Sequence, residues 1–222
     1  GQLTRRLLHP VPGLPRLRLS TIDAVDLDAD LLRLLAEETR LMPHLHLSLQ
    51  AGDDMILQRM KRRHLRADAV ALCERLRRLR PDIVLGADLI AGFPTETDTM
   101  FQNSLRLIAD CDLTFLHVFP YSPRPGTPAA RMPQVPGAER KERAARLRAE
   151  GDVALRRFLD MQVGKSAEVL LEKPGFGRSS HFAPVYLDSA TPGEPMPGDL
   201  VSCRIVARQG QALQATTRDA LS

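Results

Sequence analysis

The stretch HLHLSLQAGDD, residues 44–54, decides the fold that we expect for this chain. Leu45, Leu47 and Leu49 alternate with polar residues, as in a β-strand with one apolar and one polar face. In an antiparallel sheet the polar face would simply meet water. The residues that follow begin with turn and capping residues and continue with apolar residues at helical spacing. A strand that runs into a helix favours the βα units of a parallel sheet, whose polar face lines a barrel interior.

The alternation of strand and helix continues over the first two thirds of the chain. We expect a helix directly after Gln50, strands at 17–20, 44–50, 82–93 and 115–122, and further helices at 28–40, 67–80 and 96–110. Strands that are separated by helices at this spacing predict a parallel sheet. Four strands are fewer than a closed barrel needs. The sheet is therefore either open or the C-terminal part of a barrel.

The character of the sequence changes near residue 162. Residues 122–137 are rich in Pro and Gly, and a long charged helix is expected after them, from 138 to 160. From residue 163, short alternating segments separated by turns predict a small all-β barrel of about sixty residues. We therefore divide the chain into an α/β domain at 1–162 and a β-barrel domain at 163–222.

Composition sets broad limits on function. The 222 residues are 43% hydrophobic and carry a net charge of +4, which is too small to decide for nucleic acid. No apolar run approaches the roughly 20 residues that span a bilayer, and no signal peptide is evident, so we expect a cytoplasmic protein without membrane contact. Cys73, Cys111 and Cys203 match neither a disulfide framework nor a metal-ligand spacing. We expect reduced core cysteines and no metal-binding residues.

Two strand ends carry candidate binding residues. Gln50 ends its strand on the side where ligands bind in parallel βα folds. Asp88 lies in the most apolar strand and shares a face with Gly86 and Gly92, which would let a ligand approach closely. A hydrogen-bonded structural Asp is an equal alternative. The GFPTE turn at 92–96 suits a polar ligand if its backbone N–H groups are free.

Basic and aromatic residues add to these candidates. Four basic side chains crowd residues 59–63. Complementarity to the helix dipole explains most of them, but an Arg there could also reach a carboxylate or phosphate. His117, Phe119 and Tyr121 share one face of the last strand, which suggests a flat ligand, although a core position is the simpler explanation for Phe119. No hydrolytic motif is present, and the histidines are scattered.

Taken together, four stretches resemble the radical S-adenosylmethionine methylthiotransferases that modify tRNA. They are LRLSTID (17–23), HLHLSLQAGDDMILQRMKRRH (44–64), DLIAGFPTET (88–97) and HVFPYSPRPGTPAARM (117–132). Within this family, HLSLQAGDD, MKRRH and HVFPYSPRPGTPAARMPQVP are most similar to the members that act on threonylcarbamoyladenosine. The residues from 163 onward resemble the TRAM domain, a small OB-like barrel that binds RNA.

The resemblance implies a fold and an activity. The fold is a partial (β/α) radical SAM barrel followed by the TRAM barrel. The activity converts threonylcarbamoyladenosine next to the anticodon into its 2-methylthio derivative, using S-adenosylmethionine and [4Fe-4S] clusters. The expected partner is the tRNA anticodon stem-loop, with no role for DNA or membranes. The alternative is a non-catalytic RNA-binding module.

The resemblance also implies site residues, although no catalytic residue. Gln50 would touch the ribose of S-adenosylmethionine, and Arg62, on the helix that follows, its carboxylate. The other residues expected at this site are Ser20, Asp88, Gly92, Phe119 and Tyr121. In the barrel, whose acidic and basic residues balance, RNA binding requires basic side chains gathered beside a stacking aromatic. The residues expected there are Lys165, Phe176, Arg178, Phe182 and Arg204.

The chain departs from the family in one respect. The family holds a [4Fe-4S] cluster through a CxxxCxxC loop, and these 222 residues contain no such motif. The chain also begins at what resembles the third barrel strand. We therefore expect a C-terminal part of a longer enzyme that is inactive alone and binds no iron.

Overall fold

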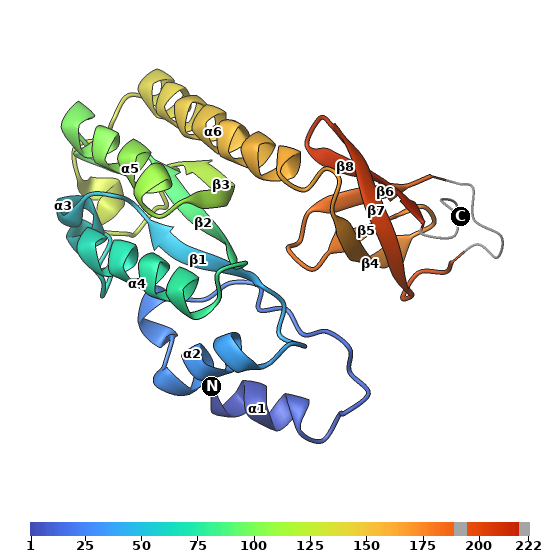
Figure 1. Ribbon diagram of the computed structural model, residues 1–222. Helices are drawn as coiled ribbons and strands as arrows, with labels where there is room; N and C mark the ends of the chain where they lie inside the picture. Colours follow the sequence, from blue (N-terminus) through green and yellow to red (C-terminus); the bar gives the residue numbers. More distant parts are fainter. Residues whose placement is uncertain (189–194, 218–222) are drawn as a thin grey trace. The chain divides into compact units, whose positions relative to one another are not determined.

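The computed structural model describes residues 1–188 and 195–217. The chain divides into two compact units, Gly1–Gly151 and Asp152–Ser222. The division falls inside the long helix α6 (Gly137–Asp160), which Figure 1 shows in yellow to orange. The first unit is an α/β structure and the second contains a β-barrel. The division into domains at residues 162 and 163 stays a prediction.

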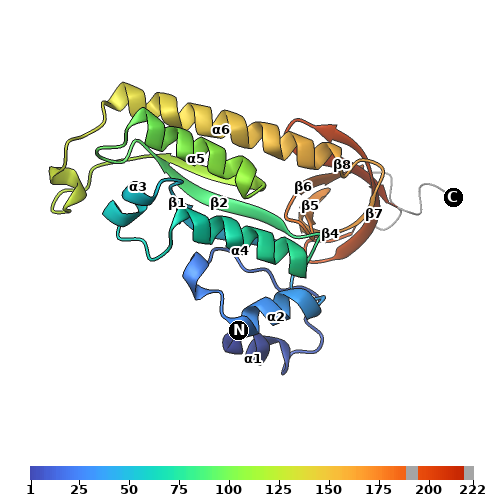
Figure 2. The same ribbon diagram turned by 60° about the vertical axis from the view of Figure 1, so that its left-hand side comes forward.

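The first unit is built on a parallel sheet of three strands. These are β1 (His44–Gln50), β2 (Val84–Ala91) and β3 (Leu113–Pro120), in the order β1-β2-β3. The helices α3 (Asp54–Arg59) and α4 (Arg66–Leu79) connect β1 to β2, and α5 (Asp98–Asp110) connects β2 to β3. Figures 1 and 2 show this alternation of strand and helix. The predicted parallel sheet is confirmed.

The strand predicted at 17–20 does not form. The chain meets β1 and the residues before it only at two isolated bridges, Leu17 with Leu41 and Ile22 with Leu47. Leu17 and Ile22 are five positions apart, but their partners are six positions apart, so the two bridges are out of register. The backbone N–H of His44, which would continue the first bridge, donates instead to the carbonyl of Met42 at 2.8 Å. A continuous ladder therefore cannot form.

Three short helical segments accompany this part of the chain. They are α1 (Gln2–Leu8), η1 (Ala24–Asp26) and α2 (Ala29–Glu37). The side chain of Asp28 accepts a hydrogen bond of 2.7 Å from the backbone N–H of Leu31 and so caps α2. The helix predicted at 28–40 is thus present but shorter.

The two faces of β1 are both enclosed. Leu45, Leu47 and Leu49 are fully buried and belong to the apolar core that the sheet shares with α2, α4, α5 and α6. Burying a leucine contributes roughly 1.5–3 kcal/mol. On the opposite face His44 and His46 are only 2% and 4% exposed. The polar face of HLHLSLQ is therefore enclosed at His44 and His46 and partly exposed at Ser48 and Gln50, and the parallel pairing with β2 excludes the antiparallel alternative.

The second unit contains a closed barrel of five strands. They are β4 (Ser166–Lys173), β5 (Phe176–Ser179), β6 (Pro184–Leu187), β7 (Leu200–Gln209) and β8 (Ala212–Thr217), in the order β4-β5-β6-β8-β7. Its core is apolar and includes Val169, Leu171, Val185, Cys203 and Ile205. The predicted small β-barrel is confirmed. The last expected segment, 211–219, extends by two residues beyond the described part of the chain.

The long helix α6 contributes to both cores. Ala144 and Leu147 are buried in the first unit, and Phe158 and Leu159 in the second. The short 3-10 helix η2 (Ala129–Arg131) precedes it. In the described residues no helix combines the length and the apolar character needed to cross a membrane.

The three cysteines lie inside the two cores. Cys73, on α4, and Cys111, at the end of α5, belong to the first unit, and Cys203 belongs to β7. All three are free thiols and fully buried. The predicted core position of the three cysteines is confirmed.

Candidate ligand-binding site at the strand ends

A cavity of about 550 Å³ opens at the C-terminal ends of the parallel strands. It is lined by Gln50, Asp88, Ile90, Phe119, Pro120, Tyr121, Ser122, Arg124, Thr127 and Ala129. Strand ends of this kind carry the ligand sites of parallel βα folds. The structure thus brings together Gln50, Asp88, Phe119 and Tyr121, four of the residues expected at one site. The contribution of residues 122–129 was missed, because a Pro-rich loop gives no periodic signal.

Gln50 is held in an unusual backbone conformation. Its φ is +69°, a left-handed value that residues other than Gly adopt rarely. The pairing of β1 with β2 shifts register between Leu47 and Gln50, so the strand ends in an irregular turn. Strain of this kind collects at ligand sites. Gln50 lines both the first cavity and a second one of about 410 Å³.

The second cavity brings two arginines to Gln50. Its lining residues are Gln50, Arg59, Met60, Lys61, Arg62, Ile90, Phe93, Thr127, Pro128 and Ala129. The Nη2 of Arg62 donates hydrogen bonds to Asp23 Oδ2 at 2.7 Å and to the carbonyl oxygen of Ser48 at 2.8 Å. Arg59 Nη1 and Arg62 Nε are buried and have no hydrogen-bond partner among the described residues. Buried donors without partners are costly, so an anionic group in this cavity would stabilise them.

Arg62 does not lie on the helix after Gln50, where it was predicted. Helix α3 ends at Arg59, and Arg62 lies in the loop before α4. The reason is Lys61, whose φ of +57° turns the chain so that the backbone N–H of Arg62 donates to the carbonyl of Leu57 at 2.9 Å. Arg63 points elsewhere: its side chain is 67% exposed and pairs with Asp26 at 3.1 Å.

The aromatic residues of β3 differ in their surroundings. Phe119 is 52% exposed, so its interpretation as a core residue was wrong. Tyr121 is half-buried and its ring meets that of Phe93 edge to face, with 5.2 Å between the centroids. The backbone carbonyl of Tyr121 accepts a hydrogen bond of 2.8 Å from Arg140. One side of the cavity therefore has a fixed aromatic ring and the other an accessible one.

Asp88 lies between two histidines at the edge of the cavity. Its Oδ1 lies 3.0 Å from His46 Nε2 and 3.2 Å from His117 Nδ1. Burial lowers the pKa of His46, an effect that the neighbouring Asp88 carboxylate partly opposes. The sequence did not reveal this cluster, because its members come from three strands that only the sheet register aligns.

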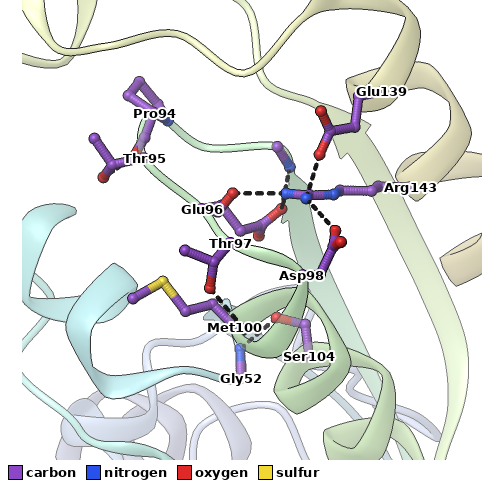
Figure 3. Close-up of polar contacts among 11 residues, drawn as sticks. Gly52, Pro94, Thr95, Glu96, Thr97, Asp98, Met100, Ser104, Glu139 and Arg143 are labelled. Carbon is purple, nitrogen blue, oxygen red and sulfur yellow. Dashed lines mark hydrogen bonds and ion pairs between the residues drawn. The ribbon is translucent and has the colours of Figure 1, made fainter.

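The GFPTE turn is closed by its own glutamate. The backbone N–H of Gly92 donates to Glu96 Oε2 at 2.9 Å, so the expectation of a free N–H there was wrong. Arg143 Nη1 donates to the same Oε2 at 2.8 Å, and Arg143 also pairs with Asp98 and Glu139, as Figure 3 shows. Burial raises the pKa of the Glu96 carboxyl, against the opposing effects of Arg143 and the Gly92 N–H. The network ties the turn to α6.

Two expected residues lie outside both cavities. Gly92 is buried with φ +70°, and a Cβ there would collide with the Arg140 side chain. Ser20 is exposed, in the segment that does not form a strand. Neither residue is among those that line the two cavities.

The barrel residues expected to contact RNA form two groups. Arg178 lies over the ring of Phe182 at 4.5 Å and near that of Phe176 at 5.8 Å. Lys165 and Arg204 instead lie together near the start of β4, where Ser166 pairs with Arg204. Both are exposed.

The structure adds two residues to the first group. The ring of Tyr186, 46% exposed, is 5.0 Å from that of Phe176, and Lys173 Nζ is 4.9 Å from the Phe176 centroid. Phe176 and Tyr186 line a depression of about 620 Å³. The pairing of β5 with β6 creates this neighbourhood, and the sequence offered no signal for it.

Comparisons with known proteins agree with this fold. The family model of the Radical SAM superfamily matches residues 4–108. These residues are therefore similar to members of that superfamily. The solved structure of coproporphyrinogen III oxidase (HemN) from Escherichia coli, described as a radical SAM enzyme, matches with a TM-score of 0.55 over 96% of this chain and 55% of that one. Its 17% identity supports the fold alone.

A curated relative narrows the resemblance. The chain is 52% identical over 188 residues to threonylcarbamoyladenosine tRNA methylthiotransferase MtaB of Rickettsia prowazekii. The match covers 85% of this chain and 45% of the relative. The chain thus spans less than half the length of the relative that it matches. The resemblance to the MtaB type, stated from the motifs, is confirmed.

Proposed function

We propose that this chain is part of a methylthiotransferase that converts threonylcarbamoyladenosine beside the tRNA anticodon into its 2-methylthio derivative. The proposal is supported by the 52% identity to MtaB and by the radical SAM match. Because tRNA is the proposed substrate, the cytoplasm is the proposed compartment. The anticodon stem-loop is the part of the tRNA that carries the reacting nucleoside.

The two adjoining cavities are the proposed site for S-adenosylmethionine. The observation that carries this proposal is the convergence of Gln50, Arg62 and Phe119 around them. Arg62 would bind the carboxylate through its unpaired Nε, Gln50 would orient the ribose hydroxyls, and Phe119 would offer a face to the adenine. S-adenosylmethionine would supply the methyl group and, on reduction, the radical.

The cysteines of this chain do not suit an iron–sulfur cluster. A [4Fe-4S] cluster needs cysteine thiolates that reach one point. Cys73 and Cys111 are buried in the helical core of the first unit, and Cys203 is buried inside the barrel of the second. These three cysteines do not form a cluster-binding set.

The proposed cofactor site is tested by calorimetric titration of the chain with S-adenosylmethionine. Arg62→Ala should weaken binding by roughly 1.5–3 kcal/mol, since it removes a charge-assisted contact. Arg63→Ala is the matched control and should leave binding nearly unchanged, because that side chain lies outside both cavities. Thermal unfolding of both variants checks that Arg62 is not acting through its bonds to Asp23 and Ser48. Equal losses in affinity would contradict the assignment.

The barrel is the proposed RNA-binding part, of the TRAM kind. Phe176 and Tyr186 provide stacking faces, and Lys173 and Arg178 place positive charge beside them. Lys165 and Arg204 would contact phosphates at a second place. Phe182, half-buried under Arg178, would orient that arginine more than it stacks on a base.

Titration of the chain with an anticodon stem-loop at several salt concentrations tests RNA binding. Because few phosphates are neutralised, the affinity should fall only slowly as the salt concentration rises. In a plot of the logarithm of the binding constant against the logarithm of the salt concentration, each phosphate contact should contribute about −0.7 to −0.9 to the slope. Tyr186→Ala should weaken binding by about 1–3 kcal/mol. Ser202→Ala, an exposed change on β7, is the control. RNA binding without any S-adenosylmethionine binding would favour the alternative of a non-catalytic RNA-binding module.

A further inference from the structure

Three potential metal ligands converge on the inner face of the parallel sheet. His46 comes from β1, Asp88 from β2 and His117 from β3, and their ligand atoms all lie within 4.8 Å of one another. Asp88 and His117 are direct partners in the β2–β3 register. His46 pairs with Gly86, which is two residues before Asp88 on β2. The cluster therefore lies across three adjacent strands, below the layer formed by Gln50 and Phe119.

The distances are close to those of a metal site. Ligand atoms that bind one zinc ion at about 2.0–2.2 Å lie about 3–3.5 Å from one another. Asp88 Oδ1 is already 3.0 Å from His46 Nε2 and 3.2 Å from His117 Nδ1. The two imidazole rings are 4.4 Å apart at an angle of 33°. The His117 side chain is 64% exposed, so it has room to turn and close the third edge.

The surroundings of His46 hold this ligand in place. The His46 side chain is 5% exposed, and a Cβ at Gly86 would lie only 2.5 Å from its Nδ1, so the glycine makes room for the ring. The Nε2 of this ring lies 3.0 Å from Asp88 Oδ1, on the side of the ring that faces the other two ligands. Asp88, His117 and Arg18 lie around this ring.

We infer that His46, Asp88 and His117 bind a divalent transition-metal ion of the zinc type, with an open coordination position toward the cavity. Two imidazole nitrogens and one carboxylate oxygen suit Zn²⁺ and its relatives better than Mg²⁺ or Ca²⁺, which prefer oxygen ligands. Asp88 lines the cavity that Gln50 and Phe119 also line, so a polar group of a bound molecule could complete the coordination. The inference does not depend on the proposed function.

Metal titration of the full chain tests the site. The chain, without an affinity tag, is stripped with a chelator and titrated with Zn²⁺ by calorimetry and with Co²⁺ by visible absorption. We expect one ion per chain, and a Co²⁺ spectrum without a thiolate charge-transfer band, since no cysteine belongs to the cluster. Mg²⁺ should give no saturable binding. No saturable Zn²⁺ binding, or equal binding of Mg²⁺, would overturn the inference.

Variants separate this site from adventitious binding. His117→Ala and Asp88→Asn should each weaken Zn²⁺ binding at least tenfold. His9→Ala, at an exposed histidine of the same unit, should leave it unchanged. Because His117 is largely exposed, its variant should fold, and circular dichroism checks this. If His117→Ala binds Zn²⁺ as tightly as the unchanged chain, Asp88 only accepts hydrogen bonds from the histidines. S-adenosylmethionine titration of the metal-free chain tests the proposed function separately.

Discussion

The two compact units differ most in what they bury. Of the eight buried polar or charged residues in the described part of the chain, seven lie in the parallel-sheet unit, among them His46, His64, Glu96 and Arg143. The barrel buries only Thr217 in this class. In the sheet unit these polar side chains lie between strands, helices and turns that pack together, and buried polar groups of this kind need hydrogen-bond partners, as Glu96 finds in Arg143. A small closed barrel fills its interior with apolar residues, and its polar groups meet water.

This contrast separates the chemistry of the two units. In the sheet unit, buried polar groups carry stability costs that hydrogen bonds must offset. One of these groups, His46, lies 3.0 Å from Asp88, which lines the first cavity. In the barrel, Phe176, Arg178 and Tyr186 contribute little to the core. Changes to buried polar groups should therefore affect the stability of the first unit. The stability of the second unit should depend instead on how closely its backbone packs.

The largest effect is expected from Arg143→Ala. The change leaves Glu96, whose side chain is 1% exposed, without its cation, and removing one partner of a buried ion pair costs about 3–5 kcal/mol. Urea unfolding measures the loss, and hydrogen exchange locates it. Arg146→Ala on the same helix is the control, because Arg146 is exposed and only contacts Phe101. An equal loss of protection in the barrel would show that the units do not differ as described.

A smaller effect is expected from Gly177→Ala in the barrel. The new Cβ would collide with the backbone carbonyl of Leu170 on β4, which no side-chain movement can relieve. Overpacking of this kind costs about 1–3 kcal/mol. Gly13→Ala is the control, since nothing lies within 4 Å of a Cβ there. Thermal unfolding followed by exchange mapping should place the loss in the barrel, and a loss confined to the sheet unit would contradict the comparison.

The smallest effect is expected from acidification. Burial lowers the pKa values of His46 and His64, so the unfolded chain takes up protons at these positions more readily than the folded chain. The contribution of these two histidines to the free energy of unfolding is present above about pH 6.5 and is lost as the pH falls below it. The loss is about 1.4 kcal/mol per histidine for each unit by which its pKa in the folded chain lies below its pKa in the unfolded chain. Burial raises the pKa of Glu96, which acts in the opposite direction.

Hydrogen exchange at pH 7.5 and 5.5, corrected for intrinsic rates, measures this loss in each unit. Protection should fall in the sheet unit, and His64→Gln should reduce the fall. A barrel that loses protection as fast as the sheet unit would mean that the buried histidines are not responsible.

Local patterns predicted most of the fold correctly. The alternation in HLHLSLQ matches β1, and its enclosed polar face follows from the helix that comes next. The same reasoning brought Gln50, Asp88, Phe119 and Tyr121 to one cavity, because parallel strands end at a common edge. The prediction of a strand at 17–20 was wrong because strand pairing depends on register, which periodicity alone does not specify.

The sequence by itself determined the order of strands and helices, the polar face of β1 and the closed barrel, because periodicity and turn residues act over a few positions. Only the tertiary structure decided which distant side chains meet. Glu96 and Arg143 are 47 positions apart, and His46 reaches Asp88 across 42. Such contacts depend on strand register and on how α6 packs against the sheet, and both are set by the whole core rather than by neighbouring residues.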